Sequence, residues 1–391
     1  MDHREHFVRD CLADRFTVTD ACARYGISRK TGYKWLDRFE HGGRAGLADH
    51  SRRPEYSPDA TATPLIDEIV KMREKHPTWG AKKLRPKLEK KDPHASWPAP
   101  STIALILKRT GLVTEARRRR RVILPGTARD AIVATAPNVV WTADFKGQFR
   151  TRDRRYCYPL TVMDRYSRYL LECYGMVRPT LDETARCFRA IFEQYGLPAV
   201  LRTDNGTPFC GTGLARLSRL AVWWMRLGIR LDRIHPASPQ ENGSHERMHR
   251  TLKHETARPP AADCRRQNVR FGTWGDEYNY ERPHEALGQI PPGEVYAPST
   301  RPYPTRLPEV VYPGHFEVRH VASNGTVSLD AKAYFLSETL DGQDIGLEEI
   351  DDGLWTAYFV DVPIARINQG TKTVEPAPER GGNPPVSDPA A

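Results

Sequence analysis

Apolar side chains recur at helical spacing near the start of the chain. Gly32, Trp35, Leu36 and Phe39 stand at positions i, i+3, i+4 and i+7, which is the pattern of a helix with one buried face. Ser28 precedes this run, and serine is a favourable residue for capping the first turn of a helix. We therefore expect a helix that begins just after Ser28.

Two shorter helices are predicted before it, at residues 4–13 and 18–25, with Gly26 in the connecting turn. Three short helices with a turn before the third predict a helix-turn-helix domain in residues 1–42, whose last helix would lie in the major groove of DNA. The alternative is a plain three-helix module with a solvated basic face. The residues expected on the outward, DNA-contacting face are Arg29, Lys30, Tyr33 and Lys34.

A second helical pattern occupies residues 64–113. Apolar positions recur around residues 65–70 and again around residues 103–107, and a basic segment, Trp79–Lys91, lies between them. Pro86 should kink or shorten that segment, because proline lacks the backbone N–H that a helix interior needs. We expect a second, helical or winged DNA-binding module here.

Two linkers separate these modules from their neighbours. Residues 43–63 are rich in Gly, Arg, Ser and Pro, and residues 114–136 contain a run of arginines. Such a run of arginines is commonly a solvated charge block. Between two DNA-binding domains, however, it can also contact the phosphate backbone of the DNA. The arginines expected to do so are Arg117, Arg118 and Arg119.

From residue 137 the pattern changes to alternating strands and helices. Apolar and polar residues alternate over residues 139–149, which predicts a half-buried strand with Asp144 on its polar face. The order of elements, three strands, helix, strand, helix, strand and helix, is that of a ribonuclease H-like mixed sheet in residues 137–290. The strands are expected at 139–149, 156–164, 169–176, 199–203 and 229–231, and the helices at 180–195, at 214–227, from Ser238 onward and at 262–280.

The last part of the chain has short apolar runs between turn signals. Residues 308–368 therefore predict a small all-β domain, which we expect to be barrel-like. Residues 369–391 are rich in Pro, Gly and acids and predict a disordered tail. The expected fold class is a multidomain chain with α, α/β and β parts.

Charge divides the chain in the same way. The net charge is +11 in residues 1–136, +6 in residues 137–299 and −7 in residues 300–391. Because phosphate neutralisation dominates affinity for nucleic acids, we expect the first third to bind DNA. The seven cysteines form no C-x-x-C pair, and neither a signal peptide nor a membrane span is evident, so a cytoplasmic protein, associated with the nucleoid of a bacterium, with reduced thiols is expected.

Three carboxylates stand at positions where elements of the core should meet. Asp204 follows a predicted strand, 59 residues separate it from Asp144, and 41 separate it from Glu246 on the following helix. Converging carboxylates without cysteine suit Mg²⁺, with Mn²⁺ as a substitute, and two such ions support in-line displacement at phosphorus. We expect these three residues to be both catalytic and metal-binding.

Neighbouring residues should assist them. Asn205 and Gly206 fit a tight turn that lets the backbone approach DNA, and Arg250 and Lys253 share a helix face with Glu246. Glu241 is a rival third carboxylate, although Ser238 and Glu241 also form a capping box.

A different chemistry is suggested by His245-Glu246-Arg247-Met248-His249, which matches the H-E-x-x-H pattern of zinc proteases. The basic residues of this helix and the two unexplained aspartates argue against zinc. His245, Met248, His249 and Leu252 fall at helical spacing and can instead pack on the sheet.

Residues 137–290 resemble the retroviral-integrase-like DDE transposases of bacterial insertion sequences. The chain departs from this family in two ways. The interval between Asp204 and Glu246 is longer than the corresponding interval in integrases, which we attribute to a longer helix that includes Ala221–Met225. The His-His-Cys-Cys zinc module at the N-terminus of integrases is replaced by the predicted helix-turn-helix. The resemblance rests on W-T-A-D-F-K at 141–146, T-D-N-G at 203–206, P-Q-E-N-G-S-H-E-R-M-H-R-T-L-K at 239–253, and Tyr278, Asn279, Arg282, Pro283, His284, Ala286 and Leu287.

The resemblance implies a transposase with Asp144, Asp204 and Glu246 as its catalytic triad. Such an enzyme binds the terminal inverted repeats of its element, cuts the ends and joins their 3′-hydroxyls to a target duplex. A homo-multimer is expected, because two ends must be joined together. The alternatives are a DNA-binding regulator without catalysis and a ribonuclease H-like nuclease that cleaves without joining.

Overall fold

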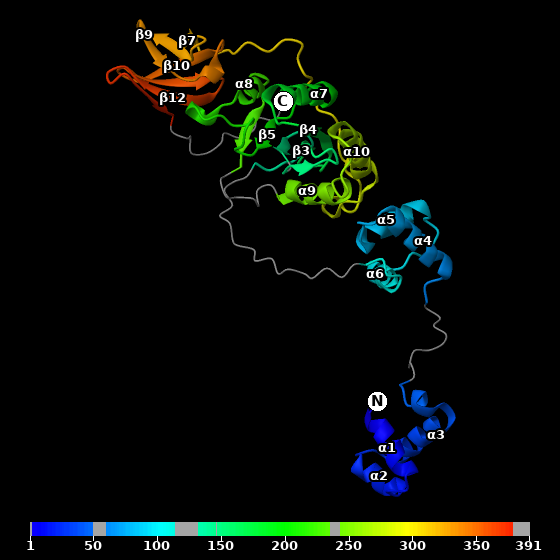
Figure 1. Cartoon of the computed structure of the whole chain (residues 1–391). Helices are drawn as coiled ribbons and strands as arrows, with labels where there is room; N and C mark the ends of the chain where they lie inside the picture. Colours follow the sequence, from blue (N-terminus) through cyan, green and yellow to red (C-terminus); the bar gives the residue numbers. More distant parts are fainter. Residues whose placement is uncertain (1, 50–59, 114–131, 146, 235–242, 378–391) are drawn as a thin grey trace. The chain divides into compact units, whose positions relative to one another are not determined.

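The computed structural model describes residues 2–49, 60–113, 132–145, 147–234 and 243–377 (Figure 1). The chain divides into two compact units, Met1–Ala62 and Thr63–Ala391. Within the described residues, no helix is both long enough and apolar enough to cross a membrane.

The first unit consists of α1 (Asp2–Leu12), α2 (Val18–Arg24) and α3 (Arg29–Gly46). Ser28 caps α3 as predicted, because its hydroxyl accepts from the backbone N–H of Thr31 at 3.2 Å. A side chain at Gly32 would approach Cys22 Sγ to 2.5 Å, so glycine at this position lets α3 pack closely on α2.

This unit extends beyond the boundary expected at residue 42. The helix α3 continues through a kink at Gly43, whose φ is +55°, and ends at Gly46. Leu47 is buried in the same cluster as Phe7 and Cys22, and Arg4 donates to its carbonyl at 2.8 Å. The segment after residue 42, which composition suggested was a linker, therefore contributes to the core.

The second unit begins with three helices, α4 (Thr63–Lys75), α5 (Ala81–Lys91) and α6 (Pro100–Arg109). Pro86 lies inside α5 without ending it. Residues 60–113 contain no strand, so a purely helical module is found and the winged alternative is wrong.

The six-stranded central sheet has the order β2-β3-β1-β5-β6, with β4 also paired to β3. The strand β1 is antiparallel to β3 and parallel to β5, and β5 is parallel to β6. This mixed topology is the predicted ribonuclease H-like arrangement. The bounds are β1 Val140–Phe145, β2 Phe149–Arg150, β3 Tyr156–Asp164, β4 Leu170–Met176, β5 Val200–Thr203 and β6 Arg230–Arg233.

Helices cover both faces of this sheet. On one face α7 (Leu181–Tyr195) and α8 (Arg219–Arg226) enclose a cluster that includes Trp141. On the other, α9 (Gly243–Thr256) and α10 (Cys264–Asp276) enclose a second cluster; Figure 1 shows α7 and α9 on opposite sides of β3. The expectation of a half-buried first strand was therefore wrong, since Thr142 on its polar face is only 1% exposed.

The C-terminal part is an open antiparallel sheet of order β13-β12-β11-β10-β7 beside a separate β8-β9 hairpin. No closed barrel forms among the described residues, so the barrel-like expectation is not confirmed. The strand β13 pairs with β12 and lies within the segment predicted to be a disordered tail. The bounds are β7 Glu317–His320, β8 Thr326–Leu329, β9 Lys332–Phe335, β10 Asp344–Asp351, β11 Leu354–Phe359, β12 Val362–Asn368 and β13 Thr373–Pro376.

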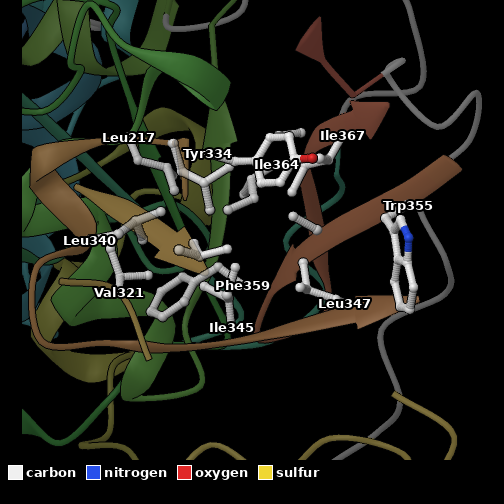
Figure 2. Packing of buried hydrophobic residues seen from close by; sticks show 14 of the residues in the cluster. Leu217, Val321, Tyr334, Leu340, Ile345, Leu347, Trp355, Phe359, Ile364 and Ile367 are labelled. Atoms are coloured by element: carbon white, nitrogen blue, oxygen red, sulfur yellow. The ribbon is translucent and has the colours of Figure 1, made fainter. Parts of the chain in front are cut away.

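This sheet shares its hydrophobic core with the central domain. Leu217 and residues of α8 pack in one cluster with Val321, Ile345 and Phe359 (Figure 2). The helix α8 has only eight residues, so the longer intervening helix expected from the sequence was wrong. The 3₁₀ turn η1 (Leu214–Arg216) precedes α8, and its Leu214 and Ala215 pack against the shared cluster.

Candidate active site

The first two predicted carboxylates lie at equivalent ends of neighbouring parallel strands. In the β1–β5 ladder, Ala143 is the partner of Thr203, so Asp144 and Asp204 are the next residues in register. Because side chains alternate along a strand, Asp144 lies on the same face of the sheet as Thr142. That face is the one covered by α9 and α10.

The turn after β5 is fixed by its own side chains. The Asp204 carboxylate accepts from the backbone N–H of Gly206 at 3.1 Å, and Asn205 donates to the carbonyl of Ile234 at 2.7 Å. A Cβ at Gly206 would lie 3.1 Å from the Asp204 carboxylate. Glycine therefore leaves space beside the acid, which is consistent with a tight supporting turn.

The helix α9 presents two different faces. His245, Met248, His249 and Leu252 are buried, as their helical spacing predicted. Glu246, Arg250 and Lys253 are exposed and follow one another at i, i+4 and i+7. The predicted third carboxylate and its two basic neighbours thus form one solvent-facing strip.

The two buried histidines contact threonines of the sheet. His245 Nδ1 lies 2.8 Å from Thr142 Oγ1, and His245 Nε2 lies 2.7 Å from Thr161 Oγ1. His249 Nε2 lies 2.6 Å from the same Thr161 hydroxyl, and its Nδ1 lies 3.7 Å from Asp144 Oδ2. Burial lowers the pKa of His245 to about 3, so this ring is neutral at physiological pH.

These contacts disfavour the zinc-protease interpretation. Both ring nitrogens of His245 are engaged by hydroxyls, and the ring is fully buried. Zinc-bound histidines instead keep one nitrogen for the metal. The H-E-x-x-H pattern here anchors a helix to a sheet.

Carboxylate oxygens at Asp144 and Asp204 are ligands of the type that Mg²⁺ prefers. However, the described residues contain no group of three or more His, Cys, Asp or Glu side chains that could hold a metal ion. The structure therefore brings the two aspartates to adjacent strand ends and places Glu246 on the helix packed beside them, without assembling all three into a cage. The rival Glu241 lies outside the described residues.

The far end of α9 is held by a half-buried carboxylate, Glu255, that the sequence did not reveal. Glu255 accepts from Arg282 Nη1 at 2.9 and 3.0 Å and from Trp274 Nε1 at 2.6 Å. Thr78, from the preceding helical module, donates to it as well. One acid thus connects α9, α10 and the segment after the π-turn η3 (Glu277–Glu281), as well as the helical module.

The basic helix α5 faces the core. Lys82 pairs with Glu285 at 3.2 Å and Lys90 with Glu294 at 2.9 Å, while Lys83 donates to the carbonyl of Pro283. Desolvation, with Arg282 as a second cause, lowers the pKa of Lys83 to about 8. Lys82 and Lys90 therefore neutralise acids of the same chain, whereas Lys83 binds a backbone carbonyl.

The residues predicted for DNA contact in the first unit are on its surface. Arg29, Lys30, Tyr33 and Lys34 are all exposed on α3, and Tyr33, a large aromatic residue, is 58% exposed. Arg117, Arg118 and Arg119 fall outside the described residues.

Thr142 and Thr161 were also missed as parts of the site. A threonine two residues before Asp144 was a usable signal, because it must lie on the same face of the strand. The second threonine could not be found without the pairing register, which places Thr161 opposite Asp144.

Models of known protein families match both the N-terminal helical region and the central domain. A helix-turn-helix domain matches residues 3–55 and a homeodomain-like domain matches residues 31–107. The integrase core domain matches residues 134–239 and again residues 227–292.

Relatives come from insertion elements and retroviruses. The insertion element IS407 uncharacterized 31.7 kDa protein of Burkholderia multivorans is 26% identical over 64% of this chain and 87% of its own length. The IS476 uncharacterized 39.2 kDa protein of Xanthomonas euvesicatoria is 26% identical over 65% of this chain and 70% of its own. The Pol polyprotein of feline endogenous virus ECE1 is 35% identical over 30% of this chain and 10% of its own.

A solved structure, the HTLV-2 integrase catalytic core domain, is 16% identical and covers 42% of this chain and 100% of that one, with a TM-score of 0.34. The sequence matches carry the assignment. They confirm the resemblance to the DDE transposases of bacterial insertion sequences, and residues 134–239 and 227–292 match the integrase core domain.

Proposed function

We propose that this protein is a DNA transposase that binds the terminal inverted repeats of its element, cuts the element's ends and joins their 3′-hydroxyls to target DNA. The observation that carries the proposal is that Asp144 and Asp204 directly follow the paired residues Ala143 and Thr203 of neighbouring parallel strands, with Asp144 on the face covered by α9. The relation to insertion-element proteins supports a polynucleotidyl transferase.

Each part of the chain has a role in this proposal. The exposed face of α3, with Lys30 and Lys34, binds the ends of the element. Arg250 and Lys253 contact phosphates beside the reacting strand, and the turn at Asn205 and Gly206 supports Asp204 while the backbone approaches DNA. The protein acts as a homo-multimer, so that two ends can be held together.

Asp144 and Asp204 would hold a divalent cation, Mg²⁺ or Mn²⁺, with Glu246 as the third ligand. When bound as a pair, such ions activate an attacking oxygen and stabilise the leaving oxygen at phosphorus. The chain's own contribution is to fix the strand ends, to place basic residues beside the phosphates and to orient the carboxylates.

The test is an end-joining assay. Purified protein is incubated with labelled duplex from the DNA that flanks its coding sequence, with Mg²⁺ or with EDTA. Joined products that require the metal would establish the transposase. Cleaved but unjoined products would indicate a nuclease.

The same assay selects the third carboxylate. Glu246→Gln and Glu241→Gln make the same chemical change five residues apart, so each is the matched control for the other. We expect joining to be lost in Glu246→Gln and retained in Glu241→Gln. The reverse result would assign the role to Glu241.

A catalytically silent DNA-binding regulator is the second candidate, and the match of residues 3–55 to a helix-turn-helix domain favours it. Tight DNA binding with neither cleavage nor joining, under Mg²⁺ and Mn²⁺, would support the regulator.

A further inference from the structure

Two of the seven cysteines meet where the first turn of α10 contacts the central sheet. Cys157, from β3, has none of its surface exposed, and Cys264, the first residue of α10, is half-buried. Their sulfur atoms lie 3.8 Å apart, although 107 positions separate the two residues in the sequence. Among the residues that the structure describes, no other two cysteine sulfurs are in hydrogen-bond contact.

Contacts with Gly175 of β4 hold the start of α10 in this place. Asn268, one helical turn after Cys264, accepts from the backbone N–H of Gly175 at 2.6 Å and donates to its carbonyl at 3.0 Å. The sulfur of Cys264 lies 3.2 Å from the same carbonyl oxygen. The backbone of the sheet therefore keeps the Cys264 sulfur beside Cys157.

The approach of α10 to the sheet requires glycine at position 175. A Cβ at this position would lie 2.5 Å from Cys157 Sγ, which is an overlap, and 3.0 Å from Asn268 Oδ1. The space that a side chain would take is thus used by the sulfur of Cys157. The contact between the two thiols is consequently part of how this helix packs on this sheet.

The two thiols differ in access and in acidity. Cys264 retains contact with solvent, whereas Cys157 is fully covered. Their mutual hydrogen bond lowers the pKa of the Cys264 thiol and raises the pKa of the Cys157 thiol. Because the thiolate is the form that reacts with oxidants, an oxidant from solvent reacts first with Cys264.

We propose that Cys157 and Cys264 form a redox-modification site, at which a hydroperoxide oxidises the two thiols to one disulfide. A disulfide bond is about 2.05 Å long, so the sulfurs must approach by roughly 2 Å, and rotation of the Cys264 side chain at the helix start brings them together. In a reducing compartment such a disulfide is transient, and exchange with a small-molecule thiol restores the pair. The proposal does not depend on the proposed function.

The oxidation takes two steps. In the first, the Cys264 thiolate attacks an oxygen of the hydroperoxide ROOH and the O–O bond breaks. The alcohol ROH leaves with the proton that the Cys264 thiol released, and Cys264 becomes a sulfenic acid. In the second, the Cys157 sulfur attacks the Cys264 sulfur, the S–O bond breaks, and the hydroxide leaves as water with the thiol proton of Cys157. The two thiols lose two electrons, which reduce the hydroperoxide to alcohol and water.

The test uses the full-length protein, first reduced and then treated with a small excess of hydrogen peroxide. Remaining thiols are blocked while the chain is unfolded, and digestion with trypsin follows without reductant. We expect the protein to lose two of its seven thiols. Mass spectrometry should show one new species, separable by reduction, that joins peptides 156–165 and 254–265, which contain Cys157 and Cys264.

Three substitutions by serine identify what each thiol does. Cys264→Ser should leave Cys157 reduced, because the covered thiol has no access to the oxidant. Cys157→Ser should stop the reaction at the sulfenic acid of Cys264, which dimedone traps. Cys187→Ser is the control, because it removes a half-buried thiol of α7 that contacts no other cysteine sulfur within the described ranges, and it should form the disulfide as wild type does.

Three results for the wild type would overturn the proposal. Peptides 156–165 and 254–265 could stay unlinked, or one of them could be linked to a third cysteine. A sulfinic acid at Cys264 would show that Cys157 does not reach the sulfenic acid. These results come from the wild-type digest alone, so they decide the proposal even if a variant does not fold, and they are independent of any activity on DNA.

Discussion

Replacing Glu255 with Gln should destabilise the second unit more than any exposed charge change does. The carboxylate is 15% exposed and its partner Arg282 is 9% exposed. Glutamine keeps the size of the side chain but removes its charge, and it turns one acceptor oxygen into a donor. That donor would face the guanidinium of Arg282 or the indole N–H of Trp274, which now donate to the acid.

The magnitude follows from this burial. Removing one partner of a buried ion pair costs about 3–5 kcal/mol, because the other charge stays buried without compensation. The entropy of unfolding is about 2.1 cal/mol/K per residue, so the midpoint of a unit the size of Thr63–Ala391 shifts by about 1.5 °C per kcal/mol. We therefore expect Glu255→Gln to lower the unfolding midpoint of this unit by about 4–8 °C.

The chain offers a matched control for this substitution. Glu285 pairs with Lys82 at 3.2 Å, with the two side chains 72% and 71% exposed. Exposed pairs contribute about 0–1 kcal/mol, so Glu285→Gln should shift the midpoint by no more than about 1.5 °C.

The assay is thermal unfolding of the full chain, followed by tryptophan fluorescence and circular dichroism. Equal midpoints for Glu255→Gln and Glu285→Gln would refute the reasoning. That result would mean that the Glu255 carboxylate is not the buried connection between α9 and α10 that the structure shows.

Lys30→Ala and Lys34→Ala should each weaken binding to the flanking duplex and reduce the slope of log affinity against log salt by about 1; an unchanged slope in filter-binding titrations would place DNA on another face. A chain ending at residue 307 should aggregate in size-exclusion chromatography, because it exposes the face of α8 that packs in the shared core; a monodisperse, folded product would contradict this. Burial, with the charges of Lys83 and Arg282, lowers the pKa of His284 to about 3. Below about pH 6.5 the histidine is therefore protonated in the unfolded chain but stays neutral in the folded one. The free energy of unfolding consequently decreases as the pH drops below about 6.5. His284→Gln should lose less stability between pH 7 and pH 5 in urea unfolding, and an identical loss would contradict the assignment.

The order of elements in the central domain could be predicted because its strands and helices have clear periods. The same patterns located Asp204 at the end of β5 and the buried face of α9. What failed was the burial of β1. The alternation around Thr142 and Asp144 resembles a half-exposed strand, but the polar face is covered by histidines of α9, and that contact depends on residues about a hundred positions away.

The C-terminal region shows the same limit. Short apolar runs predicted strands correctly, but they did not predict that the sheet stays open or that α8 completes its core. The face of α8 formed by Val222 and Met225 looks like an ordinary buried stripe in the sequence. Only the folded chain shows that this stripe packs against a different sheet from the one packed by Trp224.

The central claim is that the acids at the ends of β1 and β5 carry out DNA joining. The most direct measurement is the single-turnover rate of joining for wild type, Asp204→Asn and Asp182→Asn, with the last as a control at an exposed aspartate of α7. The account predicts that Asp182→Asn joins DNA at the wild-type rate, whereas Asp204→Asn, with unchanged DNA binding, forms no joined product. Joining by Asp204→Asn at the wild-type rate would contradict it.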